Sequence, residues 1–236
     1  LCSDSLVIGG SPAATGGEKP YTYGWSGSSA LQQTNTANPA VKGLSRTDTF
    51  VLSVTDQSGC QRRDTVIIHP PVQVSTGPDT TYCGSGSLTI GNANPASGGK
   101  GSFTYSWTPS SNLNNANQAQ PDVTSLSKQT DFVLTATDQF SCQATDTLTV
   151  YPPVQAEAGA NETFCDSSIT LGGRRVGRGG KPGYQYQWQP AAKLSNDSIA
   201  NPKLDSLSKQ TTFSVSVTGQ KGCTKKDSVT IYPPVE

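Results

Sequence analysis

The tryptophans and cysteines of this chain recur at a fixed spacing. Trp25, Trp107 and Trp188 lie 82 and 81 residues apart. The six cysteines fall into two series with the same intervals of 81 and 82 residues, which are Cys2, Cys83 and Cys165, and Cys60, Cys142 and Cys223. A fixed period of this kind is the signature of a tandem array. The 236 residues therefore contain three copies of one unit.

Each copy ends on a double proline, at positions 70–71, 152–153 and 233–234. Consecutive prolines favour an extended conformation and act as stiff linkers. These linkers divide the chain into residues 1–71, a first copy without its opening strand, residues 72–153 and residues 154–234. Residues 235–236 are expected to begin a further copy, and residue 1 looks like a cut within a longer chain.

Within each copy, apolar and polar residues alternate with the period of a β-strand. In the second copy this pattern predicts strands A, B, C, F and G of an immunoglobulin-like domain over residues 72–82, 87–91, 102–108, 131–138 and 142–151. Gly77-Pro78 is expected to kink strand A, and residues 109–129 are expected to hold weaker strands and turns. Short strands at regular spacing, separated by Gly, Asn and Pro, indicate a β-sandwich. The sequence therefore predicts an all-β array of three sandwiches.

The composition limits what the array can bind. Charged residues make up 14% of the chain, whereas about 25% is typical, and 17 Lys and Arg balance 17 Asp and Glu. Zero net charge gives no electrostatic reason to expect nucleic acid or an anionic membrane as partner. No apolar run approaches the roughly 18 residues that span a bilayer.

The chain lacks the sequence motifs of catalysis. It contains one His and no nucleophile elbow, zinc-protease helix or phosphate loop. We therefore expect no enzyme activity and no cofactor. Calcium is a minority hypothesis, based on Asp56, Asp138 and Asp79, because Gly219 replaces the first two in the third copy. Capping of turns is the better interpretation of these aspartates.

A tryptophan on strand C is normally a core residue of such sandwiches. The pattern predicts that each Trp is buried together with a tyrosine two residues earlier, namely Tyr23, Tyr105 and Tyr186. The alternative is an exposed aromatic platform that binds sugar. The core interpretation is favoured because the tryptophan shares its strand face with two other aromatic residues.

The cysteines indicate disulfides formed in an oxidising compartment, since no Cys-x-x-Cys pair is present. Pairing within a repeat, such as Cys83 with Cys142, is one possibility. In a sandwich with immunoglobulin strand order these two residues lie roughly 25 Å apart, whereas a disulfide requires Cα atoms within about 7 Å. Stacking of successive domains instead predicts the bonds Cys2–Cys142 and Cys83–Cys223. Cys60 and Cys165 would then pair with flanking repeats.

Several motifs of the second copy resemble those of a known repeat family. They are Gly-Pro-Asp-x-Thr-x-Cys from Gly77, Tyr-x-Tyr-x-Trp (present here as Phe103-x-Tyr-x-Trp107), and Thr-x-x-Phe-x-Leu-x-Ala-Thr-Asp near residue 130. The chain resembles the PKD-like repeats of very large Bacteroidetes surface proteins, which include SprB-type gliding-motility adhesins. This resemblance implies export by the type IX system and display on the cell surface. It also implies O-glycosylation at Asp-Ser/Thr-apolar triplets, whose candidate acceptors are Ser5, Thr65, Thr147, Ser198, Ser206 and Ser228.

Together these features predict a structural segment of a long extracellular filament or adhesin, a mechanical shaft for adhesion or gliding. Its partners would be the neighbouring repeats of the same chain, with other filaments or surface polysaccharide as further contacts. A repeat array suits this role because its length scales with the number of copies. The alternative is an array of carbohydrate-binding modules attached to a secreted polysaccharide-degrading protein. An exposed aromatic strip would favour that alternative.

Overall fold

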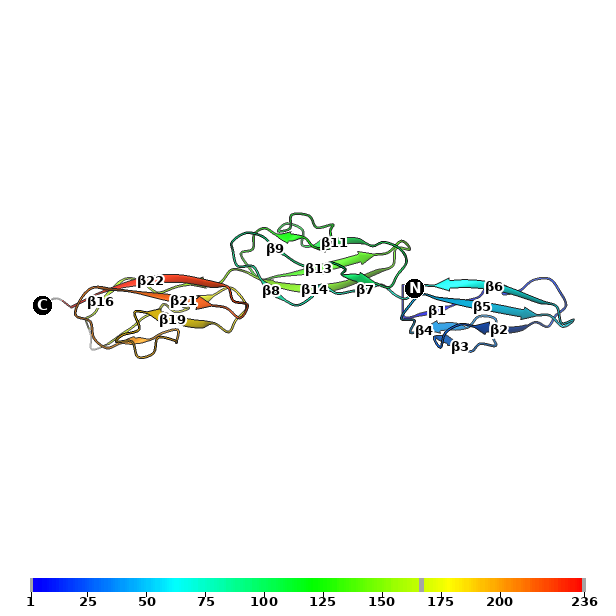
Figure 1. Ribbon diagram of the computed structural model, residues 1–236, viewed down its shortest axis with the longest axis horizontal. Helices are drawn as coiled ribbons and strands as arrows, with labels where there is room; N and C mark the ends of the chain where they lie inside the picture. Colours follow the sequence, from blue (N-terminus) through cyan, green and yellow to red (C-terminus); the bar gives the residue numbers. More distant parts are fainter. Residues whose placement is uncertain (1, 166–167, 235–236) are drawn as a thin grey trace.

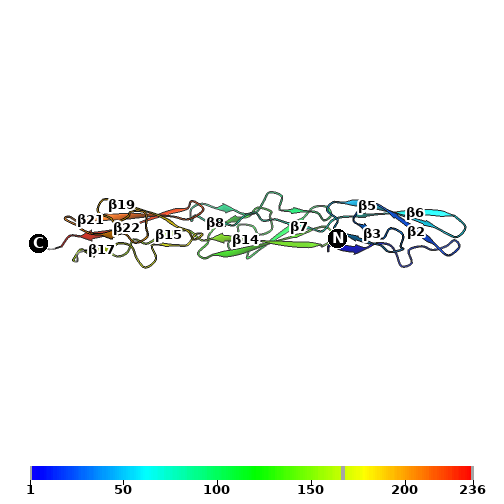
Figure 2. The same cartoon turned by 90° about the horizontal axis from the view of Figure 1, so that it is seen from below.

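The computed structural model describes residues 2–165 and 168–234. In this part of the chain every regular element is a β-strand. Three bodies lie end to end in a narrow, extended array (Figures 1 and 2). Each hydrophobic core draws its residues from one copy only. The chain is thus an array of tandem immunoglobulin-like β-sandwiches. The predicted start of a further copy at residues 235–236 lies outside the described residues.

The second copy shows the complete domain. Its larger sheet has the order C–F–G–A and consists of β11 (Thr104–Thr108), β13 (Thr130–Thr137), β14 (Gln143–Tyr151) and β8 (Thr80–Thr81). Two short pairs form the opposite layer, β7 (Gln73–Val74) with β10 (Ala96–Ser97) and β9 (Leu88–Thr89) with β12 (Asp122–Val123). The strands expected over residues 102–108, 131–138 and 142–151 therefore lie within two residues of their predicted bounds.

The third copy repeats this arrangement. Its larger sheet contains β19 (Gln185–Gln189), β21 (Thr211–Thr218), β22 (Thr224–Tyr232) and β16 (Glu162–Thr163). The short pairs are β15 (Gln155–Ala156) with β18 (Gly177–Arg178) and β17 (Ile169–Thr170) with β20 (Lys203–Leu204).

The first copy has one strand fewer in its larger sheet. That sheet contains β2 (Thr22–Ser26), β5 (Asp48–Thr55) and β6 (Gln61–Ile68), with no strand A beside β6 in the described residues. The other layer contains β1 (Ser5–Val7), β4 (Ala40–Lys42) and β3 (Leu31–Gln32).

Strand A changes sheets partway along its length. Its first half, β7, pairs antiparallel with β10, whereas its second half, β8, runs parallel to β14. The change falls at Gly77, whose φ of +85° is readily adopted only by glycine. The backbone N–H and hydroxyl of Thr76 donate to Asp146 Oδ2 at 2.8 and 2.9 Å, which ties strand A to strand G at this point. The expected kink is therefore a switch between two sheets.

The three tryptophans lie in the cores, with 8%, 1% and 0% of Trp25, Trp107 and Trp188 exposed. Each indole Nε1–H donates to a loop carbonyl eleven residues later, which satisfies its one polar atom. The tyrosines two residues before them are only half-buried and pack against the cores from the side (Tyr23, Tyr105 and Tyr186). Their placement in the core by sequence was correct in direction but too deep, because a phenol must keep its hydroxyl near water.

The Thr76–Asp146 contact predicts a loss of stability in acid. The Thr76 N–H holds the pKa of Asp146 below its ordinary value of 3.8, against an opposing effect of burial. A depressed folded-state pKa contributes stability that is present above the unfolded-state pKa and is lost as the pH falls through the folded-state pKa. Thermal unfolding of the second copy should therefore shift downward as the pH falls below about 4. Asp146→Asn should cost about 1 kcal/mol at pH 7 and reduce this acid dependence; an unchanged pH profile would contradict the assignment.

Candidate functional sites at the repeat junctions

Both junctions between repeats carry a disulfide bond. Cys2 is joined to Cys142 with a Cα–Cα distance of 4.8 Å, and Cys83 is joined to Cys223 with a Cα–Cα distance of 5.4 Å. Each bond links the end of strand A in one repeat to the turn between strands F and G in the next. These are the two pairs that stacking of the domains predicts, and Cys83 is not joined to Cys142. The first described residues accordingly lie at the junction between the first two bodies (Figure 1).

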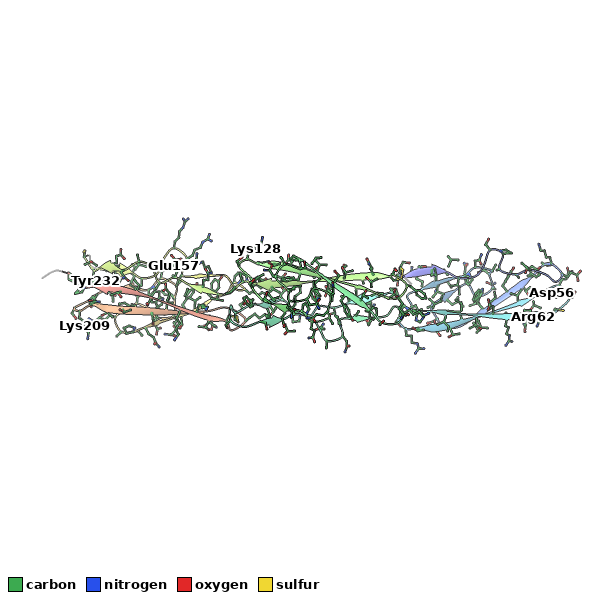
Figure 3. All side chains as sticks on the ribbon, turned by 90° about the horizontal axis from the view of Figure 1, so that it is seen from above. Asp56, Arg62, Lys128, Glu157, Lys209 and Tyr232 are labelled. Atoms are coloured by element: carbon green, nitrogen blue, oxygen red, sulfur yellow. A yellow bond between two sulfur atoms is a disulfide. The ribbon has the colours of Figure 1, made fainter. Side chains whose placement is uncertain are left out.

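Cys60 and Cys165 are both exposed and form no disulfide in the described residues. The Cys60 N–H donates to Asp56 Oδ1, and Figure 3 places Asp56 at one tip of the array. Cys165 follows Phe164, whose N–H donates to the carbonyl of Tyr232, a residue at the opposite tip in Figure 3. The two thiols thus occupy, at the ends of the array, the positions that carry disulfides at its junctions.

A Gly-Gly dipeptide holds the linker at each junction. The Gly99 N–H donates to the Pro70 carbonyl at 3.0 Å, and the Gly180 N–H donates to the Pro152 carbonyl at 2.8 Å. A Cβ on Gly98 would lie 2.1 Å from the Pro71 carbonyl oxygen. The backbone can therefore approach the linker this closely only because no side chain is present. Sequence analysis interpreted these dipeptides as turns and missed their contact with the linker, although their constant distance from the double proline was a signal.

The lysine after each Gly-Gly pair contacts an aromatic ring. Lys100 Nζ lies 4.7 Å from the centre of the Phe140 ring, and His69 of the preceding repeat lies against that ring with 6.4 Å between centroids. Lys181 Nζ lies 5.8 Å from the ring of Tyr151, which occupies the position of His69 at the second junction. Such contacts contribute about 0.5–1 kcal/mol at exposed sites. The position held by His69 and Tyr151 is thus part of each junction.

The conserved-looking aspartates at the end of strand F cap turns. Asp138 accepts from the backbone N–H groups of Lys100, Phe140 and Cys142, and Asp56 accepts from those of Glu18 and Cys60. Burial raises the pKa of Asp138, but the three N–H donors outweigh it and hold that pKa below its ordinary value. In the third copy a Cβ on Gly219 would lie 2.9 Å from Val154, so the packing of this valine leaves little room for an aspartate.

The metal-binding groups are dispersed. Within residues 2–165 and 168–234, no three His, Cys, Asp or Glu side chains converge in a way that could hold a metal ion. In the same part of the chain there is no helix long and apolar enough to cross a membrane.

All six candidate glycosylation hydroxyls are exposed: Ser5, Thr65, Thr147, Ser198, Ser206 and Ser228. The aspartate of the triplet has a structural role on strand G, since Asp146 accepts from Thr76 and Asp227 Oδ2 accepts from the Ala158 N–H at 2.7 Å. Sequence analysis did not detect this role, because strand A approaches strand G from some 70 residues away along the chain.

The arginine-rich segment of the third copy is not wholly a solvated loop. Arg174, Arg175 and Arg178 are exposed, but Val176 between them is only 2% exposed and belongs to the core. Gly177 and Arg178 form β18, which pairs with strand A. The valine supplies core packing within a run of charges, which a reading of charge alone overlooks.

No protein-family model matches this chain, and no curated protein matches it. Among solved structures, a two-domain immunoglobulin segment of DIP-gamma is 10% identical with a TM-score of 0.42, and covers 71% of this chain and 99% of that chain. The insect immune protein hemolin is 10% identical with a TM-score of 0.38, at 91% and 68% coverage. Domains EC1–4 of Drosophila N-cadherin are 13% identical with a TM-score of 0.30, at 96% and 71% coverage. Such low identities and scores carry no information about function.

The linker contact predicts an asymmetry between two glycines with similar backbones. Gly98 and Gly86 have φ of +73° and +70°, but a Cβ on Gly86 would meet nothing within 4 Å. Gly86→Ala should therefore cost only the strain of a left-handed residue, about 1–2 kcal/mol. Gly98→Ala must also displace the Pro71 carbonyl and should lower the unfolding temperature by about 5–10 °C more. Equal melting temperatures in calorimetry would show that the Gly-Gly contact does not hold the junction.

Proposed function

We propose that this chain is a load-bearing segment of a long extracellular filament or adhesin. The observation that carries the proposal is the position of the disulfides relative to strands A and G. Each bond begins where strand A ends and arrives where strand G of the next repeat begins. The bonds therefore connect long, extended strands that already lie along the axis of the array (Figure 2).

These connections create a short covalent path for tension. One path runs along β6, through the linker at Pro70-Pro71 and along strand A to Cys83. It then crosses the disulfide to Cys223 and continues along β22. Most of its residues are in extended strands and a proline linker, which leaves little slack. Tension on this path bypasses strands B to F, where most of the core side chains lie.

Without the disulfides, tension would load the domain differently. It would enter a repeat at the start of strand A and leave at the end of strand G. Those strands lie side by side and parallel, with Val150 opposite Thr80 and Tyr151 opposite Thr81. Only the few hydrogen bonds between β8 and β14 would resist their sliding. The disulfide carries the same tension through a covalent bond, which supports a mechanical role.

The burial of the aromatic residues favours this function over an array of carbohydrate-binding modules. Trp25, Trp107 and Trp188 are enclosed in the cores, where they offer no face to a sugar ring. The large apolar side chains that are exposed on the second and third copies, such as Phe140 and Ile199, stand apart and form no strip.

The surface setting of the filament is also part of the proposal. Disulfides persist in oxidising compartments, which supports a location outside the cell. Within that setting we assign the segment to a gliding-motility adhesin exported by the type IX system. We further assign Cys60 and Cys165 to disulfides with flanking repeats, because they occupy the same positions as the four bonded cysteines. The exposed hydroxyls of the Asp-Ser/Thr triplets are the proposed sites of O-linked glycans.

Pulling on a single chain tests the mechanical proposal. A Cys165→Ser variant leaves Cys60 as the free thiol for one handle, and the second handle is a C-terminal tag. With the Cys83–Cys223 bond intact, the shortest covalent path covers residues 60–83 and 223–236, a maximal extension of roughly 130 Å. Without any disulfide the path covers residues 60–236, or roughly 620 Å.

Two double variants provide matched controls for this measurement. Replacing Cys2 and Cys142 by Ser should leave the extension near 130 Å, because that bond is not on the shortest path. Replacing Cys83 and Cys223 by Ser should raise it to roughly 540 Å. Equal extensions for the two variants would refute the proposed load path.

Glycan attachment has a built-in comparison on strand G of the second copy. Thr147 follows Asp146, whereas Thr145 follows Ala144, and both hydroxyl-bearing residues are exposed on the same strand. Glycopeptide mass spectrometry of material from the native source should therefore find hexose on Thr147 and none on Thr145. A bare Thr147, or equal occupancy of both residues, would contradict the glycosylation proposal.

A further inference from the structure

The first repeat contains an open groove beside its last strand. The groove has a volume of about 480 Å³ and is lined by residues that include Leu52, Val54, Cys60 and Asp64. A second hollow farther along the same face shares Leu52 and Asp64 with the first, as well as Pro12 and Ala13. The two hollows therefore form one continuous channel along the sheet.

In the other repeats, strand A fills the corresponding place. Val72 packs there against Ala136 and Cys142, and only 8% of Val72 is exposed. In the third copy Val154 takes the same position and is 1% exposed. The matching residues of the first copy, Val54 and Cys60, are half-buried and exposed. The groove is thus the size and chemistry of a missing valine-bearing strand.

The backbone contacts of strand A also have counterparts in the first repeat. Strand A approaches the Gly-Gly turn, where the N–H of Gly99 or Gly180 donates to a linker carbonyl. Gly17 occupies that position in the first copy, with a φ of +67° close to the +56° and +58° of its counterparts. The N–H donor for the linker carbonyl is therefore already held in the required conformation.

A charged contact is prepared at the far end of the groove. Asp146 and Asp227 each accept a hydrogen bond from strand A, through the N–H groups of Thr76 and Ala158. Asp64 occupies the same position in the first repeat. Within the described residues, the only hydrogen bond to its carboxylate comes from the N–H of Thr65, next to it in the chain. Its second carboxylate oxygen faces the channel side of the sheet with no strand to bind.

The outer edge of β6 completes the site. In the second and third copies the corresponding strands, β14 and β22, pair with the short parallel strands β8 and β16. In the described part of the first copy no strand pairs with this edge of β6, and Ile67 is 58% exposed there. An open edge of this kind is a template for another strand.

We propose that this groove binds a strand-A peptide of the same repeat class, supplied by a neighbouring repeat. The ligand is an extended segment that begins Pro-Pro-Val. Its valine enters the pocket beside Val54 and Cys60, its second proline-linker carbonyl region lies against Gly17, and an N–H four residues after the valine donates to Asp64. This inference rests on strand pairing alone, so it stands or falls independently of the mechanical function.

A synthetic peptide with the sequence of residues 70–82 tests the proposal against the complete 236-residue chain. Isothermal titration calorimetry should show saturable binding of one peptide per chain. A peptide with aspartate in place of its valine, corresponding to Val72→Asp, should not bind, because it would bring an unpaired charge into an apolar pocket. Absence of saturable binding by the native sequence, or equal binding by both peptides, would overturn the proposal.

Substitutions in the protein locate the bound peptide. Asp64→Asn should weaken binding about tenfold, since it replaces a charged hydrogen-bond acceptor by a neutral one. Asp146→Asn is the matched control and should leave the affinity unchanged, because the groove of the second repeat already holds its own strand. Asp64 is exposed, so circular dichroism should show both variants folded. If the two variants bind equally well, the peptide lies elsewhere and the assignment is wrong.

Discussion

The covalent link between the end of one strand A and the F–G turn of the next repeat is the constraint on which the array depends. A double proline alone would join the domains by a stiff but single connection. The disulfide adds a second connection on the other side of the junction, and two connections resist bending as well as separation. The Gly-Gly contact and the lysine–aromatic pairs then act on domains whose mutual position is already fixed.

Strand A has a double role in this arrangement. It completes the sandwich of its own repeat through Val72 or Val154 and through the aspartate of strand G. It also carries the cysteine that reaches the next repeat. Because strand A follows the linker directly, the folding of each domain and the tethering of its neighbour use the same segment. The open groove of the first repeat shows the same dependence from the opposite direction.

Much of this architecture was predictable from the sequence, because the repeat fixes equivalent positions and alternation fixes strand faces. The positions of strands C, F and G followed from that alternation. The disulfide pairing followed from strand order, since only stacked neighbours bring Cys83 near Cys223. The switch of strand A between sheets, and the partners of Asp146 and Gly99, were not predictable. They depend on which distant segment lies alongside, and neither alternation nor spacing encodes that contact. The buried Val176 was hidden by the arginines beside it, whose long charged side chains remain in solvent.

The disulfide map of the chain purified from its native source tests the central claim most directly. Peptides produced by digestion under non-reducing conditions would be identified by mass spectrometry before and after reduction. The account predicts peptides that join Cys2 to Cys142 and Cys83 to Cys223. A peptide that joins Cys83 to Cys142, or free thiols at these four residues, would contradict it. The repeats would then be independent domains on proline linkers, and the array a flexible tether.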